Sequence, residues 1–139
     1  MAGSDGDGDE ADFTVERYDP ARHREEFRSW CAAWGLPESA SDLVPQFGVI
    51  APGVACAFLY RTDSPVCHID LLLSAPGVDD DLRDRAIDTI VQAIISAATE
   101  LGFTRMYAHT ALPAVVARAE RHGFVFEDKS FSFGLRRLA

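Results

Sequence analysis

The sequence lacks any long apolar run, and its first residues lack the features of a secretory signal. No apolar stretch approaches the roughly 20 residues that a helix needs to cross a bilayer. The acidic start has neither the basic segment nor the apolar segment of a signal peptide. We therefore expect a protein with no membrane partner, located in the cytoplasm or, as the alternative, inside a virion.

Cysteine and histidine motifs are also missing. The three cysteines, Cys31, Cys56 and Cys67, form no Cys-x-x-Cys pair and leave one over in any disulfide scheme. We predict that they are reduced thiols in the core. The four histidines are scattered, without a His-Glu-x-x-His motif or a cysteine cluster, so the sequence predicts no metal site.

Basic residues are few. The chain has 13 lysines and arginines against 22 aspartates and glutamates, which gives a net charge of -9. Such a protein repels phosphate backbones, so we expect no nucleic-acid partner. Five carboxylates stand in the first twelve residues without a basic neighbour: Asp5, Asp7, Asp9, Glu10 and Asp12. We predict a flexible acidic tail at 1–12 and a single domain at 13–139, since a chain of this length fits one core.

The hydrophobic pattern predicts an α+β domain. Alternating or continuous apolar runs favour strands, and apolar residues three and four apart favour helices. In chain order we expect a strand at 13–18, a helix at 21–34, a helical turn at 39–43, a hairpin at 47–51 and 54–60, a strand at 66–73, a long helix at 79–101, a strand at 105–109, a helix at 112–122, and strands at 124–127 and 131–138. Strand 66–73 is apolar at nearly every position, so we place it near the centre of the sheet with both faces covered.

Two short Gly-Phe motifs occur in the second half of the chain. Gly102-Phe103 follows the long helix, and Gly123-Phe124 follows the next helix. With these motifs and the order of its elements, the chain resembles the GNAT N-acyltransferases over about Phe13 to Leu138. The resemblance implies a three-layer fold, in which helices flank a mixed, mostly antiparallel sheet of six to seven strands.

The resemblance also implies acetyl-CoA as the cofactor, bound near Leu71, Leu73, Val78, Arg83 and Arg85. Family members hold its pyrophosphate on backbone amides at the start of the long helix, in a loop with one basic residue and two glycines. In this chain the basic position falls on Asp79 and the glycines fall on Leu82 and Asp84. Charge repulsion then predicts a dissociation constant for acetyl-CoA above roughly 100 μM. The alternative interpretation is that Asp79–Asp81 only cap the helix.

Two residues are candidates for catalysis. Asp70 lies on the strand where GNAT proteins often carry a carboxylate that acts as general base, and by strand alternation it shares a face with His68. The family's tyrosine, which protonates the leaving thiolate, falls on Ala119 in this chain, so we predict Tyr107 as its substitute. The alternatives are a structural carboxylate at Asp70 and a core or interface tyrosine at Tyr107.

Two functions stay open at this point. The first is transfer of an acetyl group from acetyl-CoA to an unidentified amine. The second is a catalytically inactive GNAT-like domain that acts as a binding or assembly module, with a protein partner or as a homo-oligomer. Segment 58–64 and the helix that carries Trp30 and Trp34 loosely resemble small acetyltransferase-like proteins of tailed viruses, which suggests a virion component. The two indoles share one helical face, where they either form an interface or pack in the core.

Overall fold

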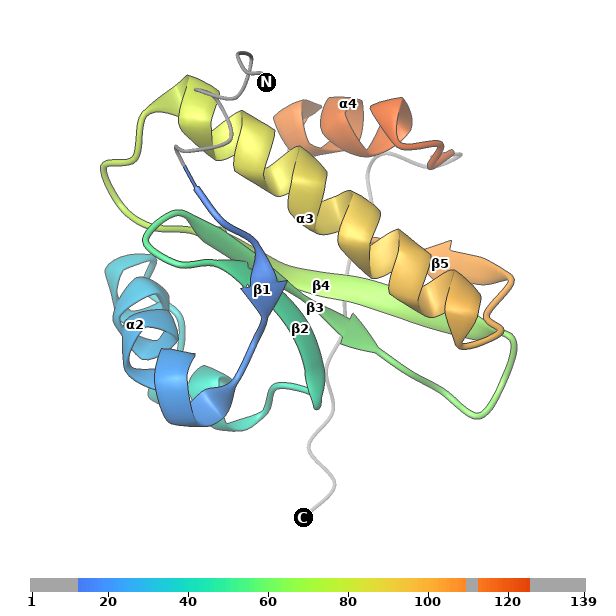
Figure 1. Ribbon diagram of the computed structural model, residues 1–139, viewed down its shortest axis with the longest axis horizontal. Coiled ribbons are helices and arrows are strands. Elements are labelled where there is room, and N and C mark those ends of the chain that lie inside the picture. The colour runs from blue at the N-terminus through green and yellow to red at the C-terminus, as the bar shows by residue number, and fades with distance from the viewer. Residues whose placement is uncertain (1–12, 110–112, 126–139) are drawn as a thin grey trace, which may run out of the picture.

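The computed structural model describes residues 13–109 and 113–125, which fold as an α+β domain (Figure 1). In chain order the elements are β1 (Glu16–Arg17), α2 (Pro20–Ala33), the 3-10 helix η1 (Glu38–Asp42), β2 (Phe47–Ala51), β3 (Ala55–Tyr60), β4 (Val66–Ser74), α3 (Asp80–Glu100), β5 (Arg105–Tyr107) and α4 (Pro113–Arg121). Their types and order agree with the prediction, and β2 has the predicted bounds. The predicted tail 1–12 and strand 131–138 lie outside the described residues.

The five strands form one mixed sheet in the order β1-β2-β3-β4-β5. Neighbours from β1 to β4 are antiparallel, and β4 pairs in parallel with β5. The expectation of six to seven strands is wrong for the described part of the chain. Phe124 and Val125, which begin the predicted strand 124–127, follow α4 without joining the sheet, and the rest of that strand lies outside the described residues.

Helices cover both faces of the sheet, which confirms the three-layer arrangement (Figure 1). On one face, Ile87, Ile90 and Ile94 of α3 form an aliphatic stripe against β2 and β3. On the other face, Phe27 and Trp30 of α2 pack against the aromatic side of the same strands. Two separate hydrophobic cores therefore hold the sheet between its helices.

The helices begin and end at the residues that the sequence indicates. Asp19 caps α2 by accepting the backbone N–H of Ala21 at 3.0 Å, and Gly35 ends that helix with a φ of 75°. Gly102 ends α3 in the same way, with a φ of 95°. No helix in residues 13–109 and 113–125 is long and apolar enough to cross a membrane.

The most buried strand is β3, which corrects the expectation that residues 66–73 are covered on both faces. Residues 55–59 of β3 are fully buried, whereas Cys67 is the only fully buried residue of β4. The reason is the position of β4 in the sheet. Its first residues pair with β5, but its second half borders a cleft.

The two tryptophans lie in different environments. Trp30 is 3% exposed in the core under α2, while Trp34, the residue at which α2 ends, is 55% exposed. The indole Nε1–H of Trp34 donates to the backbone carbonyl of Ser74 at 2.7 Å. The interpretation that both indoles pack in the core is therefore wrong for Trp34, because the chain leaves the helix at this point and turns at Gly35.

The three cysteines are buried and free, which confirms the prediction of reduced core thiols. Burial raises the pKa of the thiols of Cys31, Cys56 and Cys67 above the ordinary value. Each thiol therefore stays neutral at physiological pH and is a poor nucleophile.

Candidate functional site

The parallel strands β4 and β5 separate along their length and open a cleft. They pair at Val66 with Arg105, at Cys67 with Met106 and at His68 with Tyr107, after which β4 continues to Ser74 without β5. A cleft of about 270 Å³ lies between the second half of β4, residues 108–109 and α4. The two strands therefore diverge after the pair of His68 with Tyr107.

A β-bulge lies where the strands separate. Between the pairs Phe58 with Asp70 and Cys56 with Leu73, β4 contains one residue more than β3. Leu71, within the bulge, has a φ of 55° and is the one non-glycine residue with positive φ in the described part of the chain. A leucine adopts this conformation at a cost of about 1–2 kcal/mol, and such strained bulges occur preferentially beside functional sites.

The cleft is largely aliphatic. Leu71 and Leu73 of β4, Val91 of α3, and Val115 and Ala119 of α4 line it. Its polar lining groups are Asp70, His109, Arg118 and His122. An elongated, mostly uncharged ligand suits this lining, because apolar surface leaves water on binding and little charge has to be desolvated.

Asp70, the predicted general base, lies at the bulge and lines the cleft. Its Oδ1 accepts the backbone N–H of Leu71 at 2.7 Å, which fixes the side chain at the point where the strands diverge. Burial, and secondly the negative charge of Asp70, raise the pKa of Tyr60 to about 12. Asp70 is thus electrostatically coupled to a phenol on the neighbouring strand.

Aromatic and imidazole rings gather around His68, two residues before Asp70. The ring of His68 meets the rings of Tyr107 at 5.4 Å and His109 at 5.2 Å, both edge to face. Tyr107 is 55% exposed and lines a second cavity, between the C-terminal half of α3 and the segment after α4. The structure therefore places Tyr107 in the cavity beside the cleft, in ring contact with His68.

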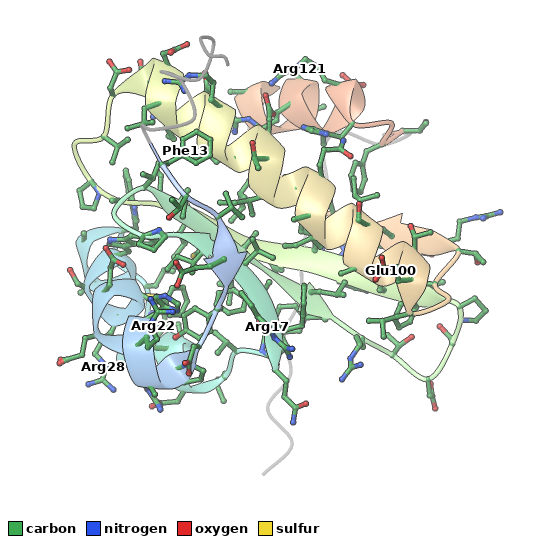
Figure 2. The ribbon with its side chains drawn as sticks, in the orientation of Figure 1. Phe13, Arg17, Arg22, Arg28, Glu100 and Arg121 are labelled. Carbon is green, nitrogen blue, oxygen red and sulfur yellow. The ribbon has the colours of Figure 1, made fainter. Side chains whose placement is uncertain are left out.

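The other predicted residues divide into two groups. Leu71 and Leu73 line the cleft, but Val78, Arg83 and Arg85 do not. Val78 packs against the core under α3. The guanidinium of Arg83 lies 3.2 Å from the Asp80 carboxylate, and that of Arg85 lies 3.0 Å from the Asp81 carboxylate. Arg85 also approaches the ring of Phe13, which Figure 2 shows beside the first turns of α3.

The backbone amides at the start of α3 already have an acceptor. Oδ2 of Asp79 accepts the N–H groups of Asp81 at 3.1 Å and Leu82 at 3.2 Å. Asp79 is therefore the cap of α3, while Asp80 and Asp81 lie in its first turn. An anionic ligand at this helix end would have to displace the Asp79 carboxylate.

Arg118 is a candidate functional residue that the sequence interpretation missed. It lines the cleft from α4, and its Nη2 donates to Asp84 of α3 at 2.6 Å. Its buried Nε–H has no hydrogen-bond partner among the described residues. Buried donors of this kind normally have an acceptor, so an acceptor from a ligand fits the position.

Further polar contacts join α4 to α3. His122 meets Asp88 at 2.9 Å and Gln92 at 2.8 Å, and Arg121, labelled in Figure 2, lies 3.4 Å from Asp88. We call these contacts, with the pair of Arg118 and Asp84, the α3–α4 latch. Asp84, Asp88 and Gln92 repeat every four residues along α3, and their partners Arg118, Arg121 and His122 have matching spacing on α4, which is the signal that could have revealed the latch.

Comparisons with known proteins identify the fold, but they show no closer relationship. No protein-family model matches the sequence, and no curated protein matches it. Among solved structures, a probable acetyltransferase superposes with a TM-score of 0.69 at 15% identity, covering 91% of this chain and 99% of its own. A Mycobacterium tuberculosis protein solved in complex with CoA gives a TM-score of 0.66 at 17% identity, covering 81% of this chain and 71% of its own.

A third solved structure is AAC(6')-Iy in complex with the bisubstrate analog CoA-S-monomethyl-acetylneamine. It has a TM-score of 0.62 at 15% identity and covers 91% of this chain and 99% of its own. Such identities establish the fold alone, and they leave the reaction of this chain open. The comparisons give no support to the looser resemblance to proteins of tailed viruses.

Proposed function

From the GNAT N-acyltransferase fold of this chain, we propose that it transfers an acyl group from a thioester bound in the cleft to an amine. The observation that carries the proposal is the opening between β4 and β5 at the strained bulge. It provides an aliphatic channel that Asp70 helps to line. A thioester arm of the acetyl-CoA type fits this channel.

The residues present do not fit the whole of acetyl-CoA equally well. The cleft suits the apolar arm, but the start of α3 does not suit the pyrophosphate. Its amides bind the Asp79 carboxylate, while Arg83 and Arg85 are paired with neighbouring aspartates. We therefore expect acetyl-CoA to bind with a dissociation constant above roughly 100 μM at physiological salt.

In this proposal Asp70 accepts the proton that the amine loses as its nitrogen attacks the acyl carbon. Its position in the lining of the cleft, held by the N–H of Leu71, suits that role. Tyr107 is the proposed donor of a proton to the departing sulfur. It is the weaker of the two assignments, because it lines the neighbouring cavity instead of the cleft.

The test is Asp70→Asn, with Asp63→Asn as the matched control in an exposed loop. Thiol release from acetyl-CoA is measured against a panel of amines. Loss of a general base lowers turnover by about 10²-fold or more, while the control keeps its rate. Equal rates for the two variants, with unchanged thermal unfolding, would make Asp70 a structural carboxylate.

A second candidate function is that of a binding or assembly module without catalysis. The observations that favour it are the capped start of α3 and Trp34, which is 55% exposed next to the cleft residue Leu36. Light scattering on the chain with and without residues 1–12 tests it. Self-association or capture of a defined partner supports the module, whereas a monomer that releases thiol from acetyl-CoA rejects it.

A further inference from the structure

Among the described residues, the one arginine that lines the cleft already has a carboxylate partner. The two basic side chains that line the cleft from α4 are Arg118 and His122. Arg118 is paired with Asp84, and His122 lies between Asp88 and Gln92. Both groups are therefore engaged by the α3–α4 latch.

The protein surface carries more negative charge at the start of α3, just after the chain leaves the cleft. After Ser74 at the end of β4, a short loop leads to Asp79, Asp80 and Asp81 at the start of α3. The carboxylates of Asp80 and Asp81 are 85% and 80% exposed, so both face solvent at the helix end. A polyanion that approaches this end meets carboxylates first, and it must also compete with Asp79 for the helix amides.

The lining of the cleft, unlike the start of α3, favours an uncharged ligand. Aliphatic side chains surround the channel, and Arg118, which also lines it, has a buried Nε–H without an acceptor among the described residues. An uncharged amide carbonyl satisfies such a donor without bringing a net charge into the aliphatic channel. A pantetheine arm is of this kind, because it is an uncharged chain that contains two amide groups.

Resting on the proposed acyl transfer, we propose that the donor is recognised by its uncharged pantetheine arm and not by its nucleotide. An acyl-pantetheine thioester then serves as well as acetyl-CoA. In the reaction the amine nitrogen forms a bond to the acyl carbon, and the bond from that carbon to sulfur breaks. Asp70 takes the proton of the amine, Tyr107 gives a proton to the departing sulfur, and the arm leaves as a free thiol.

The first experiment compares S-acetylpantetheine with acetyl-CoA by calorimetry and by NMR shifts of the Leu71 and Leu73 methyl groups. We expect dissociation constants within about threefold of each other. Acetyl-CoA binding that is tighter by about tenfold or more overturns the inference and leaves the proposed function standing. If neither compound shifts these methyl groups, the proposed function fails as well.

The second experiment removes the charges at the start of α3. In the variant Asp79→Asn, Asp80→Asn and Asp81→Asn, asparagine keeps the helix cap. We expect affinity for acetyl-CoA to rise about tenfold and affinity for S-acetylpantetheine to stay unchanged. An unchanged affinity for acetyl-CoA overturns the electrostatic basis of the inference.

The matched control for this variant removes three carboxylates elsewhere. Glu25→Gln, Asp63→Asn and Glu100→Gln change the net charge by the same amount at exposed positions away from the start of α3. We expect this control to leave both affinities unchanged. A rise in acetyl-CoA affinity as large as that of the first variant would show that net charge alone excludes the nucleotide, and the inference would be rejected.

Discussion

The region around α2 and the region around α4 are held to the same sheet by different forces. Under α2, Phe58 packs against Tyr18 at 4.9 Å and against Phe27 at 5.1 Å, and all three rings are buried. In α4 the one buried side chain among those described is Val116, and the helix is otherwise held by the α3–α4 latch and by the apolar wall of the cleft. The first region is a packed scaffold, while the second is an open site with less apolar burial to stabilise it.

The largest expected effect tests the packed scaffold. Phe27→Ala removes a fully buried ring and should lower the free energy of unfolding by about 3–5 kcal/mol, which is a large fraction of the stability of a small domain. Phe124→Ala removes the same ring from a half-buried position in the cleft and should have less than half that effect. Chemical denaturation of both variants provides the measurement. Equal losses would contradict the contrast between the two regions.

A smaller effect is expected from the latch. Asp84→Asn takes the carboxylate from Arg118, whose side chain is 15% exposed, and should lower the stability of α4 by about 1 kcal/mol. Hydrogen exchange should therefore quicken in α4 and stay unchanged in α2. Asp80→Asn, which removes a carboxylate that is 85% exposed, is the control and should leave both rates as they were.

The hydrogen bond of Trp34 joins the end of α2 to the end of β4. Trp34→Phe keeps an aromatic ring and removes the N–H that binds the carbonyl of Ser74, so we expect a loss of about 0.5–1 kcal/mol. Thermal unfolding measures the change. Arg28→Gln, an exposed substitution on the same helix, is the control. A loss above about 2 kcal/mol would mean that Trp34 contributes more packing than its exposure indicates.

The smallest effect concerns the coupling of Tyr60 to the cleft. Burial is the main cause of its pKa of about 12 and the charge of Asp70 is the lesser cause, so Asp70→Asn should lower that pKa only slightly. Phenolate absorbance as a function of pH gives the value, with Asp63→Asn as the control. A return to the ordinary value of about 10 would show that Asp70 dominates.

The raised pKa of Tyr60 also determines whether stability rises or falls with pH. An unfolded tyrosine titrates near pH 10, so between about pH 10 and 12 the unfolded state binds fewer protons than the native state. The free energy of unfolding therefore falls as pH rises through this range. Tyr60→Phe should make this decline shallower.

The strand that lines the candidate site could be predicted from the sequence. The contacts that its charged side chains make could be predicted less well. Asp70, Leu71 and Leu73 were placed on the strand that lines the cleft, because strand 66–73 has a continuous apolar pattern. Arg83 and Arg85 were predicted near the cofactor, yet they pair with aspartates on their own helix turn. The competing i, i+3 and i, i+4 carboxylates were visible in the sequence and could have indicated this outcome.

The sequence by itself determined the local structure of this protein. The caps at Asp19 and Asp79, the stops at Gly35 and Gly102, and the apolar periodicity set the elements, because each depends on residues within one or two turns of chain. Only the tertiary structure decided the geometry of the site. The positive φ of Leu71 follows from the register between β3 and β4, and the pairing of Arg118 with Asp84 joins residues 34 positions apart. Such features depend on how separate elements meet, which local patterns do not encode.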